Sequence, residues 1–162
     1  LNMTDELSTI QNEMDHVRNY LYVMDVRNGS SVAYEYQIDN ATLKDRLPRI
    51  CLQPVVENAL YHGIKYKRAK GCIHIHGEKE GDIIRLTVRD DGVGMDEETL
   101  KHIYDKHKVN YRSNGVGVYN VQQRLVLYYG KDYGIIYHSE KGKGTTASVV
   151  IPGMQEGSHE RS

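Results

Sequence analysis

Apolar residues in the first part of the chain recur at alternating spacings of three and four positions. They are Leu7, Ile10, Met14, Val17, Leu21 and Met24. This rhythm predicts a helix that has one narrow apolar seam and ends near Asn28. The seam has two interpretations, an amphipathic helix packed on its own domain or the end of a longer dimerisation helix. His16 lies between two seam residues and is expected to pack in the helix interface.

After residue 31 the pattern predicts strands and short helices. Alternating apolar and polar residues indicate half-buried strands, and apolar residues at i, i+3, i+4, i+7 and i+8 indicate a core-facing helix. A polar segment, 105–114, lacks periodicity and is expected to be a mobile lid. The expected elements are a strand over 32–38, a helix over 48–62 kinked at Pro54, strands over 72–80 and 83–90, a short helix from Asp96, a helix over 118–128, and strands over 133–139 and 145–151.

The order of these elements predicts the fold class. Helices and strands do not alternate regularly, and at least two strand pairs are hairpins, so the sheet must be mixed or mainly antiparallel. The expected fold is an α/β two-layer sandwich of a mixed, mostly antiparallel sheet with helices on one face, preceded by the N-terminal helix. The expected boundaries are 1–28 for that helix, 31–152 for the compact domain and 153–162 for a flexible tail.

Composition and charge narrow the class of protein. The 162 residues include 21 basic and 22 acidic side chains, and a net charge of -1 argues against nucleic-acid binding, which normally needs a basic surplus. Two cysteines make no disulfide framework, so we expect a reducing compartment. No apolar run approaches the roughly 20 residues of a membrane helix, although the chain could be the cytoplasmic piece of a larger protein.

The strand that ends at Asp90 carries the first candidate for ligand chemistry. Side chains alternate across a strand, so Asp90 shares a face with the apolar Leu86 and Val88 and points toward the core. A buried carboxylate needs a hydrogen-bond donor, which the exocyclic amine of a bound base could provide. Gly92 and Gly94 would leave room for its flat ring. The alternative is a plain Asp-Gly turn capped by Asp90.

Glu57, Asn58 and His62 form a second candidate on the predicted core helix. Asn58 and His62 are four residues apart and therefore share a helix face. An amide oxygen suits Mg²⁺, which keeps waters that phosphates can replace, and Glu57 could accept a proton. The alternative is a polar helix edge that faces solvent.

Two glycine motifs complete the set. Gly115 and Gly117 directly precede a helix, where backbone amides can bind an anion such as phosphate. Further along, Gly142 and Gly144 precede Thr145, which places a hydroxyl at the start of a strand. Taken alone, this last motif is also typical of a tight hairpin.

The order of the four motifs resembles the N, G1, G2 and G3 boxes of the Bergerat-fold ATPase superfamily, which includes sensor histidine kinases, gyrase-type topoisomerases, mismatch-repair ATPases and a heat-shock chaperone family. The segment LQPVVENALYHG at 52–63 is similar to the N box of one subgroup of two-component sensor histidine kinases. Residues 115–125 resemble the G2 helix of that subgroup, and residues 17–21 resemble the helix before its ATPase domain. The resemblance implies the Bergerat fold.

The resemblance also implies roles for the candidate residues, with ATP and Mg²⁺ as the ligands. Asn58 would be the magnesium ligand, Glu57 the group that accepts or orients a proton, and His62 a phosphate-side contact. The remaining residues would bind the nucleotide: Asp90 at the adenine amine, Gly92 and Gly94 beside the ring, Gly115 and Gly117 at the phosphates, and Thr145 on the adenine side through water. A phosphate contact from Lys65 or Lys67 stays open.

The same resemblance implies an enzyme, the catalytic domain of a sensor histidine kinase, with the C-terminal part of the second dimerisation helix attached at residues 1–28. It would transfer the ATP γ-phosphoryl group to a histidine on a separate dimerisation helix, for relay to a response regulator. We expect the acceptor helix upstream of residue 1, so this chain alone should not phosphorylate itself. The whole protein is expected to be a membrane-anchored homodimer with this domain in the cytoplasm. The alternatives are a Bergerat-fold ATPase that hydrolyses ATP, a serine kinase that acts on another acceptor, and an interaction module that binds no nucleotide.

Overall fold

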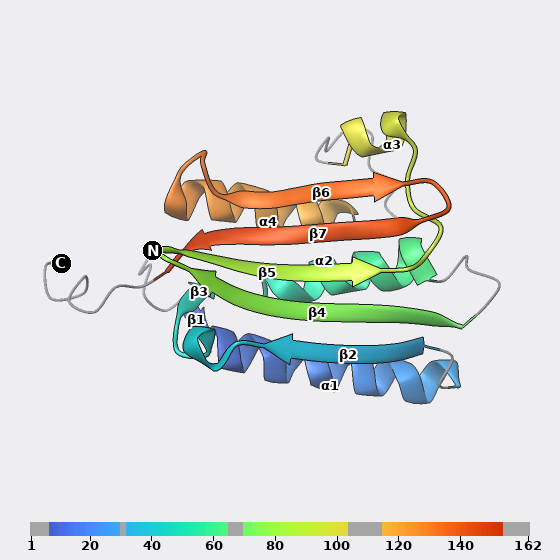
Figure 1. Ribbon diagram of the computed structural model, residues 1–162, viewed down its shortest axis with the longest axis horizontal. Helices are drawn as coiled ribbons and strands as arrows, with labels where there is room; N and C mark the ends of the chain where they lie inside the picture. Colours follow the sequence, from blue (N-terminus) through green and yellow to red (C-terminus); the bar gives the residue numbers. More distant parts are fainter. Residues whose placement is uncertain (1–6, 30–31, 65–69, 104–114, 154–162) are drawn as a thin grey trace, which may run out of the picture.

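A computed structural model describes residues 7–29, 32–64, 70–103 and 115–153 (Figure 1). The expected lid at 105–114, Lys65, Lys67 and the tail from residue 154 lie outside these residues. The described chain forms one five-stranded sheet, a small two-stranded sheet and helices that cover one face of the larger sheet. The predicted two-layer α/β architecture is therefore confirmed.

The larger sheet has the strand order β2-β4-β5-β7-β6. Only the pair β2-β4 is parallel in it, and the other three pairs are antiparallel, so the sheet is mixed and mostly antiparallel as predicted. Tight hairpin turns join β4 to β5 and β6 to β7. The strands are β2 (Val32–Ile38), β4 (Gly71–Glu80), β5 (Ile83–Asp90), β6 (Gly134–Glu140) and β7 (Gly144–Pro152).

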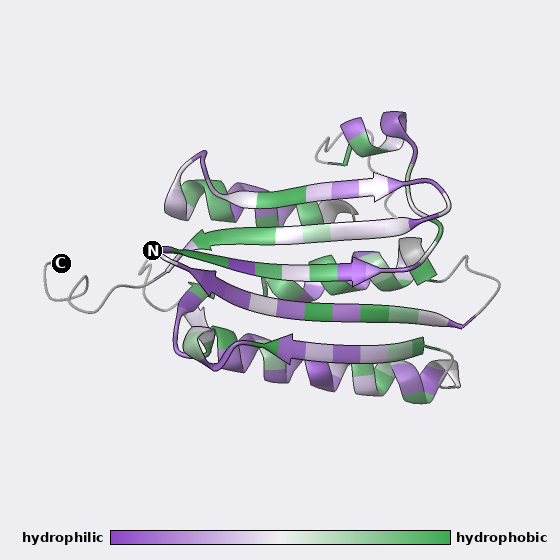
Figure 2. Cartoon of the chain, viewed as in Figure 1, coloured by the Kyte–Doolittle hydropathy of each residue, from purple (hydrophilic) through white to green (hydrophobic). Residues whose placement is uncertain are grey.

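Alternation along the strands places apolar side chains under the helices. Along β4, hydrophobic and hydrophilic residues alternate (Figure 2), and Ile73 and Ile75 are buried while His74 between them is only partly buried. The neighbouring β5 buries Ile84, Leu86 and Val88 on the same face. This face forms the core together with α1 (Ile10–Asn28), α2 (Leu52–Asn58) and α4 (Gly115–Tyr129).

The apolar seam of α1 is buried within this same chain. Ile10, Met14, Val17, Leu21 and Met24 belong to the core that includes the strands of the larger sheet, so α1 packs on its own domain. Leu7 is not part of the helix, because Leu7–Thr9 forms the short strand β1. The expectation for His16 was wrong: it is exposed, since it lies about 100° around the helix from Val17.

The predicted helix over 48–62 begins later and ends differently. Arg46–Pro48 forms the strand β3, which pairs with β1, and α2 begins at Leu52. Pro54 therefore lies in the first turn, where a backbone N–H has no helical partner, so it need not kink the helix. The chain continues after Asn58 as a π-helical turn, η3 (Ala59–Ile64).

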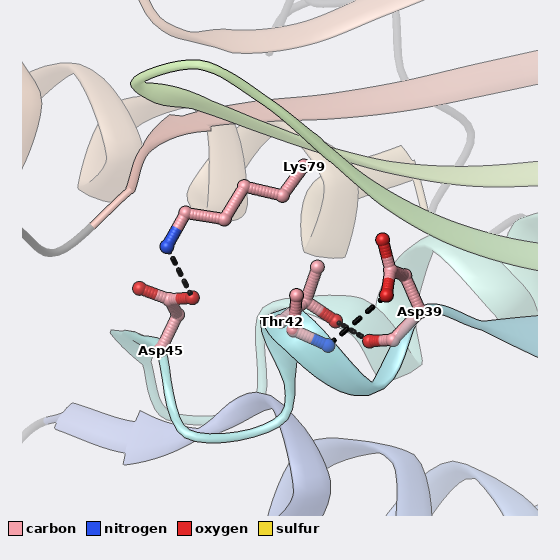
Figure 3. A network of polar contacts seen from close by, with 5 residues as sticks. Asp39, Thr42, Asp45 and Lys79 are labelled. Carbon is pink, nitrogen blue, oxygen red and sulfur yellow. Dashed lines mark hydrogen bonds and ion pairs between the residues drawn. The ribbon is translucent and has the colours of Figure 1, made fainter.

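A small polar network holds the segment before β3 against β4. Lys79 Nζ lies 3.3 Å from Oδ2 of the buried Asp45 (Figure 3). The hydroxyl of Thr42 donates to the backbone oxygen of Asp39 at 2.7 Å, within the short 3₁₀ helix η2 (Asn40–Thr42) and its cap. This network fixes the connection between β2 and β3, beside the start of α1.

Candidate functional site

Asp90 ends β5 on the face that carries the core. Its side chain is only 3% exposed, which confirms the inward direction predicted from the strand pattern. The backbone N–H of Gly92 donates to its Oδ1 at 2.9 Å, so the capped turn of the alternative interpretation is also present. A carboxylate has about four lone-pair sites on its two oxygens, so accepting from Gly92 does not by itself exclude a further N–H donor. Asp90 can therefore cap the turn and still receive an N–H from a ligand.

Thr145 lies directly opposite Asp90 in the register of β5 and β7. Its hydroxyl lies 2.7 Å from the hydroxyl of Ser139, its neighbour on β6. Ser139 in turn accepts from the backbone N–H of Met95 at 2.7 Å. Asp90, Thr145 and Ser139 thus form one row across the sheet, and Met95 connects it to the loop after β5. The sequence analysis did not identify Ser139, although its alternation with Tyr137 along β6 places it on the core face.

Gly94 allows the loop after β5 to pack closely on the turn between β6 and β7. Its φ of +69° is a conformation that favours glycine, and a Cβ there would lie 2.0 Å from the carbonyl oxygen of Glu140. The backbone N–H of Gly142 donates to the carbonyl of Val93 at 2.6 Å. In the described structure Gly94 therefore makes room for backbone, a role that the sequence analysis missed. A role in making room for a bound ring remains a prediction.

Asn58 is buried at the end of α2, only 6% exposed. Its Nδ2 donates to the hydroxyl of Tyr137 on β6 at 3.5 Å, so the alternative of a solvent-facing helix edge is wrong for this residue. In the sheet Tyr137 lies opposite Ala147, and this pair is the next one on the same face after Ser139 and Thr145. The contact brings the N box close to the row that contains Asp90.

Glu57 precedes Asn58 on α2 and is partly buried. Gln53, one turn earlier, donates from Nε2 to its Oε1 at 2.8 Å, which orients the carboxylate. Tyr20 of α1 lies close to Glu57. Burial and then the negative charge of Glu57 raise the pKa of the Tyr20 hydroxyl. His62 belongs to η3, but its side chain lies outside the described part of the structure.

The glycine motif before α4 lies beside the start of α2. A Cβ on Gly117 would lie 3.1 Å from the Cβ of Pro54, so the first turns of the two helices pack together at these residues. Gly115 begins α4. The structure thus brings the helix that begins with the glycine motif against the helix that carries Glu57 and Asn58.

Within 7–29, 32–64, 70–103 and 115–153, no group of three or more His, Cys, Asp or Glu side chains is arranged to hold a metal ion. None of the helices in these segments combines the length and the apolar character needed to span a membrane.

Comparison with known proteins places this arrangement in a family. The family model for histidine kinase-, DNA gyrase B- and HSP90-like ATPases matches residues 48–155. The sensor histidine kinase YesM of Bacillus subtilis (strain 168) is 30% identical over 156 residues, which cover 96% of this chain and 26% of that protein. The sensor histidine kinase YpdA of Escherichia coli (strain K12) is 31% identical over 151 residues, or 93% of this chain and 26% of that protein. The chain thus spans about a quarter of the length of these curated relatives.

Solved histidine kinase structures share the fold. The catalytic domain of histidine kinase ThkA matches with a TM-score of 0.66 at 18% identity, covering 91% of this chain and 97% of that one. The mycobacterial sensor histidine kinase MprB matches with a TM-score of 0.64 at 17% identity and covers 91% of this chain and 97% of that one. The sequence prediction of a histidine kinase ATPase fold is therefore confirmed.

Proposed function

This chain belongs to the histidine kinase-, DNA gyrase B- and HSP90-like ATPase family, and from that premise we propose that it is the ATP-binding catalytic domain of a sensor histidine kinase. Two sensor histidine kinases resemble it over almost its whole length, which favours this branch of the family over an ATP-hydrolysing machine or a serine kinase. The observation that carries the proposal is Asp90, a carboxylate buried on the core face opposite Thr145.

Adenine recognition is assigned to the ends of β5 and β7. The Asp90 carboxylate accepts an N–H from the exocyclic amine of the base, a charge-assisted bond in a site shielded from water. Thr145, whose hydroxyl is held by Ser139, contacts the adenine side through a water molecule. Gly92 and Gly94 present backbone without side chains to the ring.

The phosphates are assigned to the space between α2 and α4. Backbone N–H groups of the first turn of α4, at Gly115 and Gly117, have no helical partner and carry the positive end of the helix dipole, so they favour an anion. The contact between Gly117 and Pro54 supports placing these donors beside the N box. His62 is the residue of the N box that we assign to the phosphate side.

Asn58 fits a Mg²⁺ ion. Its amide nitrogen is directed to the Tyr137 hydroxyl, which leaves the side-chain oxygen for a hard cation that prefers oxygen ligands. Bound Mg²⁺ would offset phosphate charge and orient the γ-phosphoryl group. Because the Asn58 side chain is buried and held by Tyr137, its oxygen is already positioned before the ion binds.

The reaction we propose is phosphoryl transfer to histidine. The bond between the γ-phosphorus and the bridging oxygen breaks, a bond forms to a nitrogen of the acceptor imidazole, and ADP leaves. Glu57, oriented by Gln53, accepts or orients the proton of that imidazole. The acceptor belongs to a dimerisation helix outside this chain. The phosphoryl group then passes to a response regulator, and we propose that the whole protein is a membrane-anchored homodimer with this domain on the cytoplasmic side.

Calorimetric titration with a non-hydrolysable ATP analogue, with and without Mg²⁺, tests the proposal first. We expect binding in both conditions and tighter binding with Mg²⁺. No binding would leave only the alternative of an interaction module that binds no nucleotide. A second experiment uses γ-labelled ATP. The chain alone should take no acid-labile, base-stable label, and addition of the separately made dimerisation helix should give labelled histidine on that helix. Label on the exposed His16 would contradict this assignment of the acceptor.

A further inference from the structure

Glu13 is a buried acidic residue that the proposed chemistry does not use. It lies on α1 and is only 3% exposed. Its Oε1 accepts a hydrogen bond from the backbone N–H of Ile50 at 2.9 Å. Its Oε2 is also buried, and it has no hydrogen-bond partner among the described residues. Burying a charged carboxylate with one of its oxygens unpaired is unfavourable, so stability alone does not explain a glutamate here.

Ile50, the partner of Glu13, has an unusual backbone conformation. It is the only residue other than glycine with a positive φ in the described structure, at +56°. A β-branched side chain strongly disfavours that conformation, which persists only where the surrounding structure imposes it. The hydrogen bond from Ile50 to Glu13 is a direct means of imposing it. Ile50 stands two residues before Leu52, where α2 begins.

The segment that precedes Glu13 is hydrogen-bonded to the segment that precedes Ile50. β1 pairs with β3, and the backbone N–H of Ile10 donates to the carbonyl of Asp45 at 2.9 Å. The hydrogen bond between Glu13 and Ile50 is the last of this series before α2. Further along α1, Tyr20 lies near Glu57 at the other end of α2, where burial and then the Glu57 charge raise the pKa of its hydroxyl. α1 therefore meets the N box helix at both of its ends.

We propose that Glu13 is a positioning residue that fixes where α2 begins and so where Asn58 presents its side-chain oxygen. The proposal rests on the function proposed above, because it assigns Glu13 to the magnesium side of that site. α2 has only about two turns, so a displacement at Ile50 is carried to Asn58 with little helix in between to absorb it. The two unfavourable features, a buried unpaired oxygen and a strained isoleucine, coincide at the joint between α1 and α2.

The test separates the magnesium side of the site from the adenine side. Affinity for the ATP analogue is measured with and without Mg²⁺ for the wild type, Glu13→Ala and Glu13→Gln, and the ratio of the two affinities is the readout. We expect Glu13→Ala to reduce this ratio about tenfold or more, the effect seen when a group that orients a metal ligand is removed. Glu13→Gln keeps an oxygen acceptor for Ile50 and should retain most of the ratio. Affinity without Mg²⁺ should stay unchanged, because adenine recognition is assigned to Asp90, which lies on β5 and not on α2.

A control and a rescue make the result specific. Asp15→Ala removes an exposed carboxylate from the same helix and should leave both affinities unchanged. In the Glu13→Ala background, Ile50→Gly lets the backbone adopt a positive φ without strain and should restore part of the ratio. If Glu13→Ala does not fold, Glu13→Met, which keeps side-chain volume but lacks the oxygen acceptor, replaces it.

The outcomes are distinguishable. If Glu13→Ala lowers the thermal midpoint but keeps the wild-type ratio, Glu13 is a structural residue and the inference is overturned, while the proposed function stands. Equal losses with and without Mg²⁺ would overturn it as well. If the wild type binds no nucleotide, the proposed function fails and this inference fails with it.

Discussion

Asp90 and Thr145 are direct neighbours across the antiparallel strands β5 and β7, so their side chains lie on the same face of the sheet. The two residues come from motifs that are far apart in the sequence. Gly144 makes the approach possible, because a Cβ there would lie 2.1 Å from the carbonyl oxygen of Asp90.

Asp90→Asn should weaken nucleotide binding with little effect on the fold. An amide keeps the shape and can still accept from Gly92, but it replaces an anionic acceptor by a neutral one. The loss of a charge-assisted bond of about 1.5–3 kcal/mol corresponds to a roughly tenfold to hundredfold loss of affinity. Calorimetric titration measures it. Asp91→Asn is the matched control, since Asp91 is exposed and accepts from the backbone of Cys72. Equal affinities of Asp90→Asn and wild type would remove adenine recognition from Asp90.

Gly94→Ala should destabilise the domain more than Gly81→Ala. Both glycines have a positive φ, but only at Gly94 would the new Cβ meet backbone, since Gly81 has open space around it. We expect about 1–2 kcal/mol for Gly81→Ala from the backbone conformation, and about 2–4 kcal/mol for Gly94→Ala because the close contact adds to it. Urea unfolding of both variants gives the comparison. Similar losses would mean that the loop can move away from Glu140.

Lys79→Met should destabilise the protein, whereas Lys143→Met should not. Lys79 faces the buried carboxylate of Asp45, and without this cation the buried charge loses a stabilising partner, at a cost of about 1–3 kcal/mol. Lys143 lies 3.4 Å from Glu140, but both side chains are well exposed, so its removal should change the stability by less than about 0.5 kcal/mol. Thermal or urea unfolding at neutral pH distinguishes them. If both variants matched the wild type, the network in Figure 3 would contribute nothing to stability.

The buried thiol of Cys51 should make the protein less stable in alkali. Burial, opposed by the Arg124 cation and reinforced by Glu13, raises the pKa of this thiol from its ordinary value of 9.0 to about 12. Between these values the unfolded chain has released the proton and the folded chain keeps it, so stability falls as the pH rises, by about 1.4 kcal/mol per unit at most. Urea midpoints between pH 8 and 11 should therefore fall more steeply for the wild type than for Cys51→Ala. Cys72→Ala is the control, and identical slopes for wild type and Cys51→Ala would contradict the shift.

Local pattern was enough to predict the strands and the inward direction of Asp90. Alternation specifies which side of a strand faces the core, and β5 was predicted with its observed bounds for this reason. The acidic residues Asp96, Glu97 and Glu98 likewise predicted where α3 (Glu97–Lys101) starts, because capping and the helix dipole act locally. The order of the four motifs then gave the family, which the match over 48–155 confirms.

The tertiary structure decided which distant groups meet. Nothing local to Asn58 indicates that Tyr137 receives its amide, nor that Gly94 must leave space for the carbonyl of Glu140. The pairing of β1 with β3, which keeps Pro48 out of the predicted helix, also depends on a segment far away in the chain. Periodicity reports only which face of an element is apolar, whereas the partner of a buried polar group is fixed by how the elements pack. The link from Glu13 to Ile50 is the clearest case, because neither residue belongs to any of the four motifs.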